Sequence, residues 1–199
     1  MKNLVVFASG GGSNFKSIYN NIGKNKIEGA RISLLISNNP KSKAVKFAEE
    51  NSIDTFIAND SRYPDREEYV SKLIDKINEH NPELIVLAGY MKLVPKELVE
   101  TFSEMIINIH PGKLPDFGGK GCYGMNVHRA VIDSKSKTTA VTIHYVNEEY
   151  DEGMVIHEEL IDVLENDSPE SLAERVLKYE HNIYSKVIND IINKKVEYE

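Results

Sequence analysis

The stretch Asn3-Leu-Val-Val-Phe-Ala-Ser-Gly-Gly-Gly-Ser-Asn14 decides the fold. Residues 3–8 are a nearly continuous apolar run, which is typical of a strand buried on both faces of a sheet. Residues 9–14 bring three glycines, and a helical pattern then extends to about residue 22. A buried strand, a glycine turn and a helix, in this order, occupy the position of the phosphate-binding turn in Rossmann-like sheets.

Outward from this stretch, β-rich runs alternate with amphipathic stretches. We expect four further strands in the first half of the chain, over residues 32–37, 54–58, 83–88 and 105–110. Helices are expected from Pro40, with Asn39 as the cap, and over residues 65–80. This alternation indicates an α/β fold whose sheet is largely parallel.

The second half has a different pattern. Residues 111–124 are rich in glycine and proline, which predicts a long loop before a helix over 126–135. Two β-branched runs, 138–146 and 154–163, are joined by a short link, so we expect them to pair antiparallel. The last helix begins at residues 168–169, and its expected apolar stripe is Leu172, Val176, Tyr179, Ile183, Val187 and Ile191. The expected architecture is a Rossmann-like three-layer α/β sheet, mostly parallel, with an antiparallel C-terminal portion.

Composition narrows the class of protein. The 199 residues are 41% hydrophobic and 28% charged, which suits one packed domain over 1–199. The net charge of −7 disfavours sequence-independent nucleic-acid binding, and no apolar run approaches the roughly 18 to 20 residues that span a bilayer. The single Cys122 excludes an internal disulfide and any site with several thiolates. We therefore expect a cytoplasmic protein without nucleic-acid or membrane partners.

The glycine turn is the first candidate site. Glycines let the backbone approach a ligand closely, and the free N–H groups at a helix start favour an anion. The phosphate group of a substrate is therefore the expected occupant of the segment 9–14. The alternative is a tight strand-to-helix turn in which Ser13 is only the N-cap.

A second candidate site is the end of the strand over 105–110. Alternation places Asn108 and His110 on one face, at the carboxyl end where open α/β sheets bind ligands. Asn108 is suited to donate to a developing oxyanion, and His110 to donate or move a proton near neutral pH. Asp151 follows the strand that carries His144. The alternatives are a satisfied polar pair and an ordinary turn carboxylate.

Glu180 borders the apolar stripe of the last helix, where a carboxylate costs stability unless it is paired. Its partner is either a substrate ammonium group or a neighbouring Lys or Arg. A metal site is not expected, because Cys122 and His128 share a loop region without further ligands at metal-binding spacing.

Together these motifs resemble the folate-dependent formyltransferase family over residues 2–190. The resemblance rests on motifs that occur in one order along the chain: residues 9–14, 87–92, 108–111, 114–115, 128–129, 144–146, 151–153 and 180–184. The glycine turn and Glu180-His181 are similar to the branch of phosphoribosylglycinamide formyltransferases. The resemblance implies formyl transfer from 10-formyltetrahydrofolate, a cosubstrate, to the amine of glycinamide ribonucleotide in purine synthesis, with no metal.

The resemblance also implies a role for each site residue. Gly12, Ser13 and Asn14 would hold the substrate phosphate, and Glu180 would lie near the amine end. The folate pocket would contain Arg66, Met91, Lys92, Leu93, Val146 and Asp151. Asn108, His110 and Asp151 would be the catalytic set. Residues 1–100 would form the phosphate-binding half and 101–199 the catalytic and folate-binding half of a monomer or homodimer.

The chemistry of these residues agrees with direct attack by a neutral amine on the formyl carbon. Asn108 and a protonated His110 would stabilise the oxyanion. Asp151 would raise the pKa of His110 and organise a water that moves the proton to the leaving folate nitrogen.

The chain departs from the family pattern beside this strand. His110-Pro-Gly-Lys-Leu-Pro115 replaces the usual His-Pro-Ser-Leu-Leu-Pro, the glycine-rich segment 116–126 is longer, and Asn126 replaces a common histidine.

Three alternative functions remain: a formyltetrahydrofolate hydrolase, a formyltransferase for another amine, and a non-catalytic nucleotide sensor on the same fold.

Overall fold

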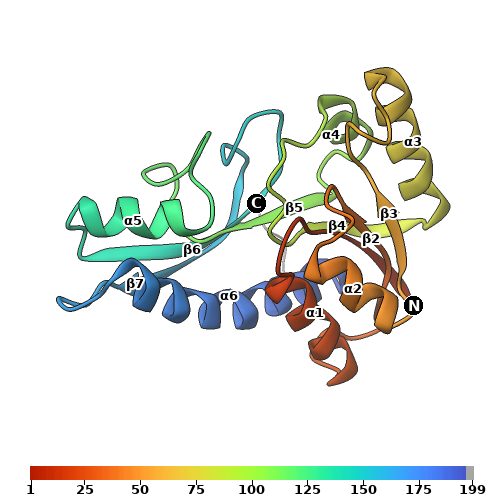
Figure 1. The fold of residues 1–199 in the computed structure, drawn as a ribbon. Coiled ribbons are helices and arrows are strands. Elements are labelled where there is room, and N and C mark those ends of the chain that lie inside the picture. The colour runs from red at the N-terminus through yellow and green to blue at the C-terminus, as the bar shows by residue number, and fades with distance from the viewer. Residues whose placement is uncertain (196–199) are drawn as a thin grey trace.

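A computed structural model describes residues 1–195, so the last four residues of the expected domain range 1–199 lie outside the described part. One seven-stranded sheet has the order β3-β2-β1-β4-β5-β6-β7 (Figure 1). Its strands are β1 Lys2–Phe7, β2 Ala30–Ser37, β3 Asp54–Ile57, β4 Pro82–Leu87, β5 Ile106–His110, β6 Thr138–Tyr145 and β7 Val155–Asp162. The first five strands are parallel to one another, whereas β6 pairs antiparallel with β5 and β7 pairs antiparallel with β6. The expected fold class is confirmed.

Helices cover both faces of the sheet, with α1, α2 and α6 on one side and α3 and α4 on the other (Figure 1). The helices are α1 Ser13–Gly23, α2 Lys43–Glu50, α3 Arg66–Glu79, α4 Lys96–Thr101, α5 Met125–Asp133 and α6 Pro169–Ile192. Strand β1 is buried on both faces, because Leu4 and Val6 belong to one apolar cluster and Val5 and Phe7 to the other. This is the arrangement that its continuous apolar run predicts.

The expected start of α2 is wrong. The helix begins at Lys43, and the Ser42 hydroxyl caps it by accepting from the N–H of Val45 at 3.1 Å. The Asn39 side chain instead accepts from the N–H of Lys41 at 3.0 Å, which closes a local turn around Pro40. Both asparagine and serine are good caps, so the residue type alone does not choose between them.

The expected apolar stripe of α6 is also wrong in part. The buried positions follow a spacing of four through Leu172, Val176, Glu180 and Tyr184, whereas Tyr179 is 39% exposed. A spacing of four moves the stripe slowly around a helix of 3.6 residues per turn. Glu180 therefore lies on the buried stripe itself rather than beside it.

Tyr184 connects α6 to the sheet. Its side chain is buried, and its hydroxyl lies 2.9 Å from the carbonyl oxygen of Leu87 and 3.2 Å from that of Ile107. These two carbonyls belong to the neighbouring strands: Leu87 is the last residue of β4, and Ile107 is the second residue of β5. The single hydroxyl hydrogen is therefore shared by two buried backbone acceptors and ties α6 to β4 and β5.

We expect Tyr184→Phe to lower the free energy of unfolding by about 1–3 kcal/mol, because two buried carbonyls lose their donor while the ring stays in place. Urea denaturation measures this change. Tyr179→Phe on the exposed side of the same helix is the control and should change stability by less than about 0.5 kcal/mol. Equal stability of the two variants would contradict the role given to the hydroxyl.

Candidate active site

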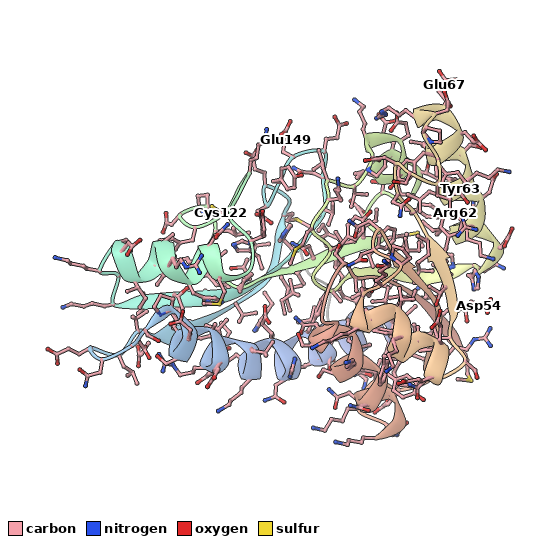
Figure 2. The ribbon with its side chains drawn as sticks, in the orientation of Figure 1. Asp54, Arg62, Tyr63, Glu67, Cys122 and Glu149 are labelled. Atoms are coloured by element: carbon pink, nitrogen blue, oxygen red, sulfur yellow. The ribbon has the colours of Figure 1, made fainter. Side chains whose placement is uncertain are left out.

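A cavity of 640 Å³ opens at the carboxyl ends of β4 and β5. Four segments line most of it: residues 89–94, 108–111, 119–125 and 149–151. Glu180 from α6 and the start of α1 complete the wall. Figure 2 shows two of the lining residues: Cys122, on the loop before α5, and Glu149, on the loop between β6 and β7. Both loops are drawn between α5 and α4 in this view. The sheet edge that the sequence selects for a ligand is thus the edge that carries the cavity.

The glycine turn leads into α1 without a side-chain cap from any described residue. Gly12 is the N-cap with φ +68°, and Ser13 is the first helical residue, so Ser13 does not cap the helix. A Cβ atom on Gly12 would lie 2.9 Å from the Cβ of Ala44. The close contact between α1 and α2 and the left-handed backbone both require glycine here. The first-turn N–H groups thus keep their attraction for an anion.

Asn14 and Glu180 meet on the wall of the cavity. The Asn14 Nδ2 atom donates to Glu180 Oε2 at 3.2 Å, and Oδ1 of Asn14 has no partner among the described residues. The Asn14 side chain therefore faces Glu180, and its main chain is the part left to meet a phosphate. No Lys or Arg within residues 1–195 pairs with Glu180, so the salt-bridge alternative is not observed.

Burial dominates the ionisation of Glu180. Removal from water raises its pKa to about 7, and the Asn14 hydrogen bond opposes this shift only in part. The carboxyl group therefore exchanges its proton near neutral pH. Two acceptor groups side by side, Glu180 and the free Asn14 oxygen, are suited to a ligand group that carries several hydrogen-bond donors.

Asn108, His144, Asp151 and His110 form one cluster. Antiparallel pairing places Asn108 opposite His144, and Asn108 Nδ2 lies 3.1 Å from His144 Nε2 and 3.4 Å from Asp151 Oδ1. Asp151 Oδ2 lies 3.5 Å from His110 Nδ1 and accepts the N–H of Gly119 at 3.0 Å. The structure therefore brings together the three residues that the sequence selects as catalytic candidates.

Asp151 itself is an unusual turn residue. Its φ of +59° lies in the left-handed region, which residues other than glycine rarely adopt, although aspartate tolerates it better than most. Its side chain is only 11% exposed. Backbone geometry of this kind is retained where surrounding contacts impose it, and here those contacts are the histidines and the loop after β5.

The pKa values of His110 and Asp151 both lie below the ordinary values of these groups. Burial lowers the pKa of His110, and Asp151 offsets that effect only in part, so the expected rise of the His110 pKa is not observed. Burial would raise the pKa of Asp151, but His144, His110 and the Gly119 N–H stabilise the carboxylate and hold its pKa below the ordinary value. The unliganded site therefore holds a neutral imidazole beside a charged carboxylate at neutral pH.

The expected folate residues separate into two groups. Met91, Lys92, Leu93 and Val146 line the cavity. Arg66 does not, because it pairs with Glu97 at 3.2 Å beside a separate surface depression. Its neighbour Glu67 lies at the end of α3, well away from Cys122 and Glu149 (Figure 2).

Sequence reasoning missed two contributors to the cluster, the carbonyl group of Phe117 and the N–H of Gly119. Phe117 O lies 2.8 Å from His110 Nε2, and the Gly119 N–H reaches Asp151. Both are main-chain groups, so no side-chain pattern reveals them.

Among residues 1–195, no group of three or more His, Cys, Asp or Glu side chains is placed to hold a metal ion. No helix in this range is long and apolar enough to cross a membrane.

Comparison with known proteins gives consistent results. The family model described as formyl transferase matches residues 2–188. The chloroplastic phosphoribosylglycinamide formyltransferase of Arabidopsis thaliana is 40% identical over 99% of this chain and 68% of its own length. The phosphoribosylglycinamide formyltransferase of Bacillus subtilis is 35% identical over 96% of this chain and 95% of its own. The crystal structure of phosphoribosylglycinamide formyltransferase from Bacillus halodurans superposes with a TM-score of 0.89 at 31% identity, covering 98% of this chain and 97% of that chain.

The raised pKa of Glu180 makes stability depend on pH. The folded state keeps the proton up to about pH 7, whereas the unfolded chain releases it at lower pH, so this group lowers the free energy of unfolding as pH rises between those values. Glu180→Gln should remove this component, which amounts to about 3 kcal/mol between pH 5 and pH 8.

Urea denaturation of both proteins at the two pH values measures the effect. The exposed Glu174→Gln on the same helix is the control and should leave the pH dependence unchanged. A stability difference between Glu180→Gln and the unmodified protein that is the same at pH 5 and pH 8 would contradict the raised pKa.

Proposed function

Because this chain belongs to the formyl transferase family, we propose that its cavity transfers a formyl group from 10-formyltetrahydrofolate to the amine of glycinamide ribonucleotide, a step of purine biosynthesis. The observation that carries this assignment is the contact of Asp151 with both Asn108 and His110 inside the cavity. An anion-binding helix start and the Asn14–Glu180 pair line the same cavity. The site therefore has a place for each part of an anionic amine substrate.

The acceptor substrate would bind along the wall from α1 to α6. Its phosphate would meet the N–H groups of Gly12, Ser13 and Asn14, where the helix dipole favours negative charge. Its amine end would lie near Glu180, which offers a carboxylate that changes its proton near neutral pH. In this arrangement residues 1–100 supply the phosphate site and the second half, from residue 101 onward, supplies the catalytic strand.

The donor would bind on the opposite wall. Met91 and Leu93 are half-exposed at the cavity, and Val146 adds a third apolar side chain, so these residues suit the flat ring system of a folate. Lys92 adds a positive charge for an anionic part of the donor. Arg66 would have to leave Glu97 before it could contact the donor, and we place it outside the core of this site.

Formyl transfer requires one bond to form and one to break. The neutral amine attacks the formyl carbon, and the carbonyl oxygen becomes an oxyanion that Asn108 and a protonated His110 stabilise by donating hydrogen bonds. Asp151, through a water, receives the proton from the attacking nitrogen, which becomes positively charged as the new C–N bond forms, and returns it to the folate nitrogen as the old C–N bond breaks. Asp151 already lies beside His110, whereas His110 Nε2 would have to leave the carbonyl oxygen of Phe117, 2.8 Å away, before it donates to the oxyanion.

All of these residues come from one chain, so the proposal holds for a monomer and for a homodimer. The direct partners are the two small-molecule substrates. A cytoplasmic location stays a prediction.

The decisive experiment follows tetrahydrofolate release from 10-formyltetrahydrofolate with and without glycinamide ribonucleotide. Release that needs the ribonucleotide supports the proposal. Release without an acceptor would replace it by a hydrolase. Binding of both ligands without release would replace it by a sensor or by a transferase for another amine.

Asp151→Asn should reduce kcat by about 10²–10⁴-fold, because an amide neither accepts the proton in transit nor raises the pKa of His110 as the carboxylate does. Steady-state formyl transfer measures the change, and substrate KM values should vary much less. The neighbouring exposed Glu152→Gln is the matched control and should keep kcat within about twofold. A similar loss in both variants would contradict a specific role for Asp151.

A further inference from the structure

The loop between β5 and α5 makes hydrogen bonds to the candidate catalytic pair through its backbone. The Phe117 carbonyl oxygen lies 2.8 Å from His110 Nε2, and the Gly119 N–H donates to Asp151 Oδ2 at 3.0 Å. We call these two groups the main-chain clamp. They are separated by a single residue, Gly118.

The carbonyl half of the clamp fixes the tautomer of His110. A carbonyl oxygen only accepts hydrogen bonds, so Nε2 must carry the hydrogen in this contact. In the neutral imidazole, Nδ1 is then unprotonated, and it lies 3.5 Å from Asp151 Oδ2. Nδ1 is therefore the position at which His110 gains its second proton, directly beside the carboxylate.

The N–H half of the clamp acts on Asp151. The Gly119 N–H occupies Oδ2, while Asn108 Nδ2 lies near Oδ1, so the two oxygens have separate partners. These two contacts oppose rotation of the carboxylate about its Cβ–Cγ bond. Its orientation toward His110 depends on the path of the loop.

The loop can follow this path because residue 118 is a glycine and has no Cβ atom. A Cβ atom there would lie 2.4 Å from Leu114 Cδ2 and 3.1 Å from Asp151 Cβ. The leucine end can rotate away, but the Asp151 Cβ belongs to a residue with left-handed backbone geometry and must shift with its carboxylate. A side chain at position 118 therefore pushes the loop and Asp151 apart.

We propose that Gly118 is a positioning residue for formyl transfer: it lets the main-chain clamp hold His110 as the Nε2–H tautomer, with Nδ1 facing a fixed Asp151 carboxylate. This inference rests on the proposed function for its kinetic consequence. Its structural part, the tautomer and its dependence on position 118, is independent of any reaction.

The first arm of the test is long-range ¹H–¹⁵N NMR of the histidine rings without substrate, with His110→Asn to assign the His110 signals. The unmodified protein should show Nε2–H and an unprotonated Nδ1 at high pH. Gly118→Ala should lose this single tautomer. Gly121→Ala is the matched control, because its φ of +92° strains the same loop while its Cβ would meet nothing within 4 Å, and it should keep the tautomer.

The second arm is steady-state kinetics of Gly118→Ala. A displaced carboxylate should lower kcat by about tenfold or more and leave both KM values within about threefold, because the walls formed by α1, α6 and residues 91–93 keep their positions. The double variant Leu114→Ala/Gly118→Ala removes the contact with leucine but keeps the one with Asp151. It should not recover kcat. Thermal unfolding of each variant checks that the fold is retained.

Several results would overturn the proposal. The first is an Nδ1–H tautomer in the unmodified protein. The second is retention of the Nε2–H tautomer in Gly118→Ala, and the third is an equal loss of the Nε2–H tautomer in Gly121→Ala. Recovery of kcat in the double variant would show simple crowding of Leu114 instead. If the unmodified protein transfers no formyl group, the proposed function fails, and the NMR arm alone decides the clamp.

Discussion

A carboxylate that is shielded from water needs hydrogen-bond donors, and Asp151 obtains them from separate parts of the chain. Asn108 comes from a central strand and Gly119 from the loop that follows this strand. His144, on the antiparallel strand beside it, places its Nε2 atom 3.6 Å from the carboxylate. Each donor is correctly placed only if the sheet order and the loop path are both correct. The requirements of one buried charge thus connect the antiparallel end of the sheet with the glycine-rich loop.

Two carboxyl groups in the same cavity experience opposite environments. Asp151 is surrounded by donors, which keep its pKa low, whereas Glu180 has a single amide donor and a pKa raised by burial to about 7. One group keeps its charge and the other exchanges its proton near neutral pH. Environments that separate the pKa values of two acids are typical of sites in which the acids have different tasks.

Much of the fold follows from hydrophobic periodicity, and the exceptions have local causes. The strands around β1 are predictable because apolar runs bounded by turns leave few alternatives. The α2 cap is not, since Asn39 and Ser42 are both competent caps. In the site, Asn108 and His110 are predictable from strand alternation, and their contact with Asp151 only from the resemblance. The carbonyl of Phe117 and the N–H of Gly119 are not predictable, because every residue carries the same backbone groups. The pairing of Arg66 with Glu97 depends on two exposed side chains, whose choice of partner no local pattern determines.

The hydrogen bond between Asn14 and Glu180 joins residues that are 166 positions apart. A chain that is still being synthesised can complete its first strands and helices, yet the cavity has no closed wall until α6 has emerged and docked. Substrate therefore finds its complete binding site only in the finished molecule, and its binding energy adds most to the stability of that molecule. In a cell, abundant substrate would selectively protect complete chains from proteolysis and leave truncated ones exposed.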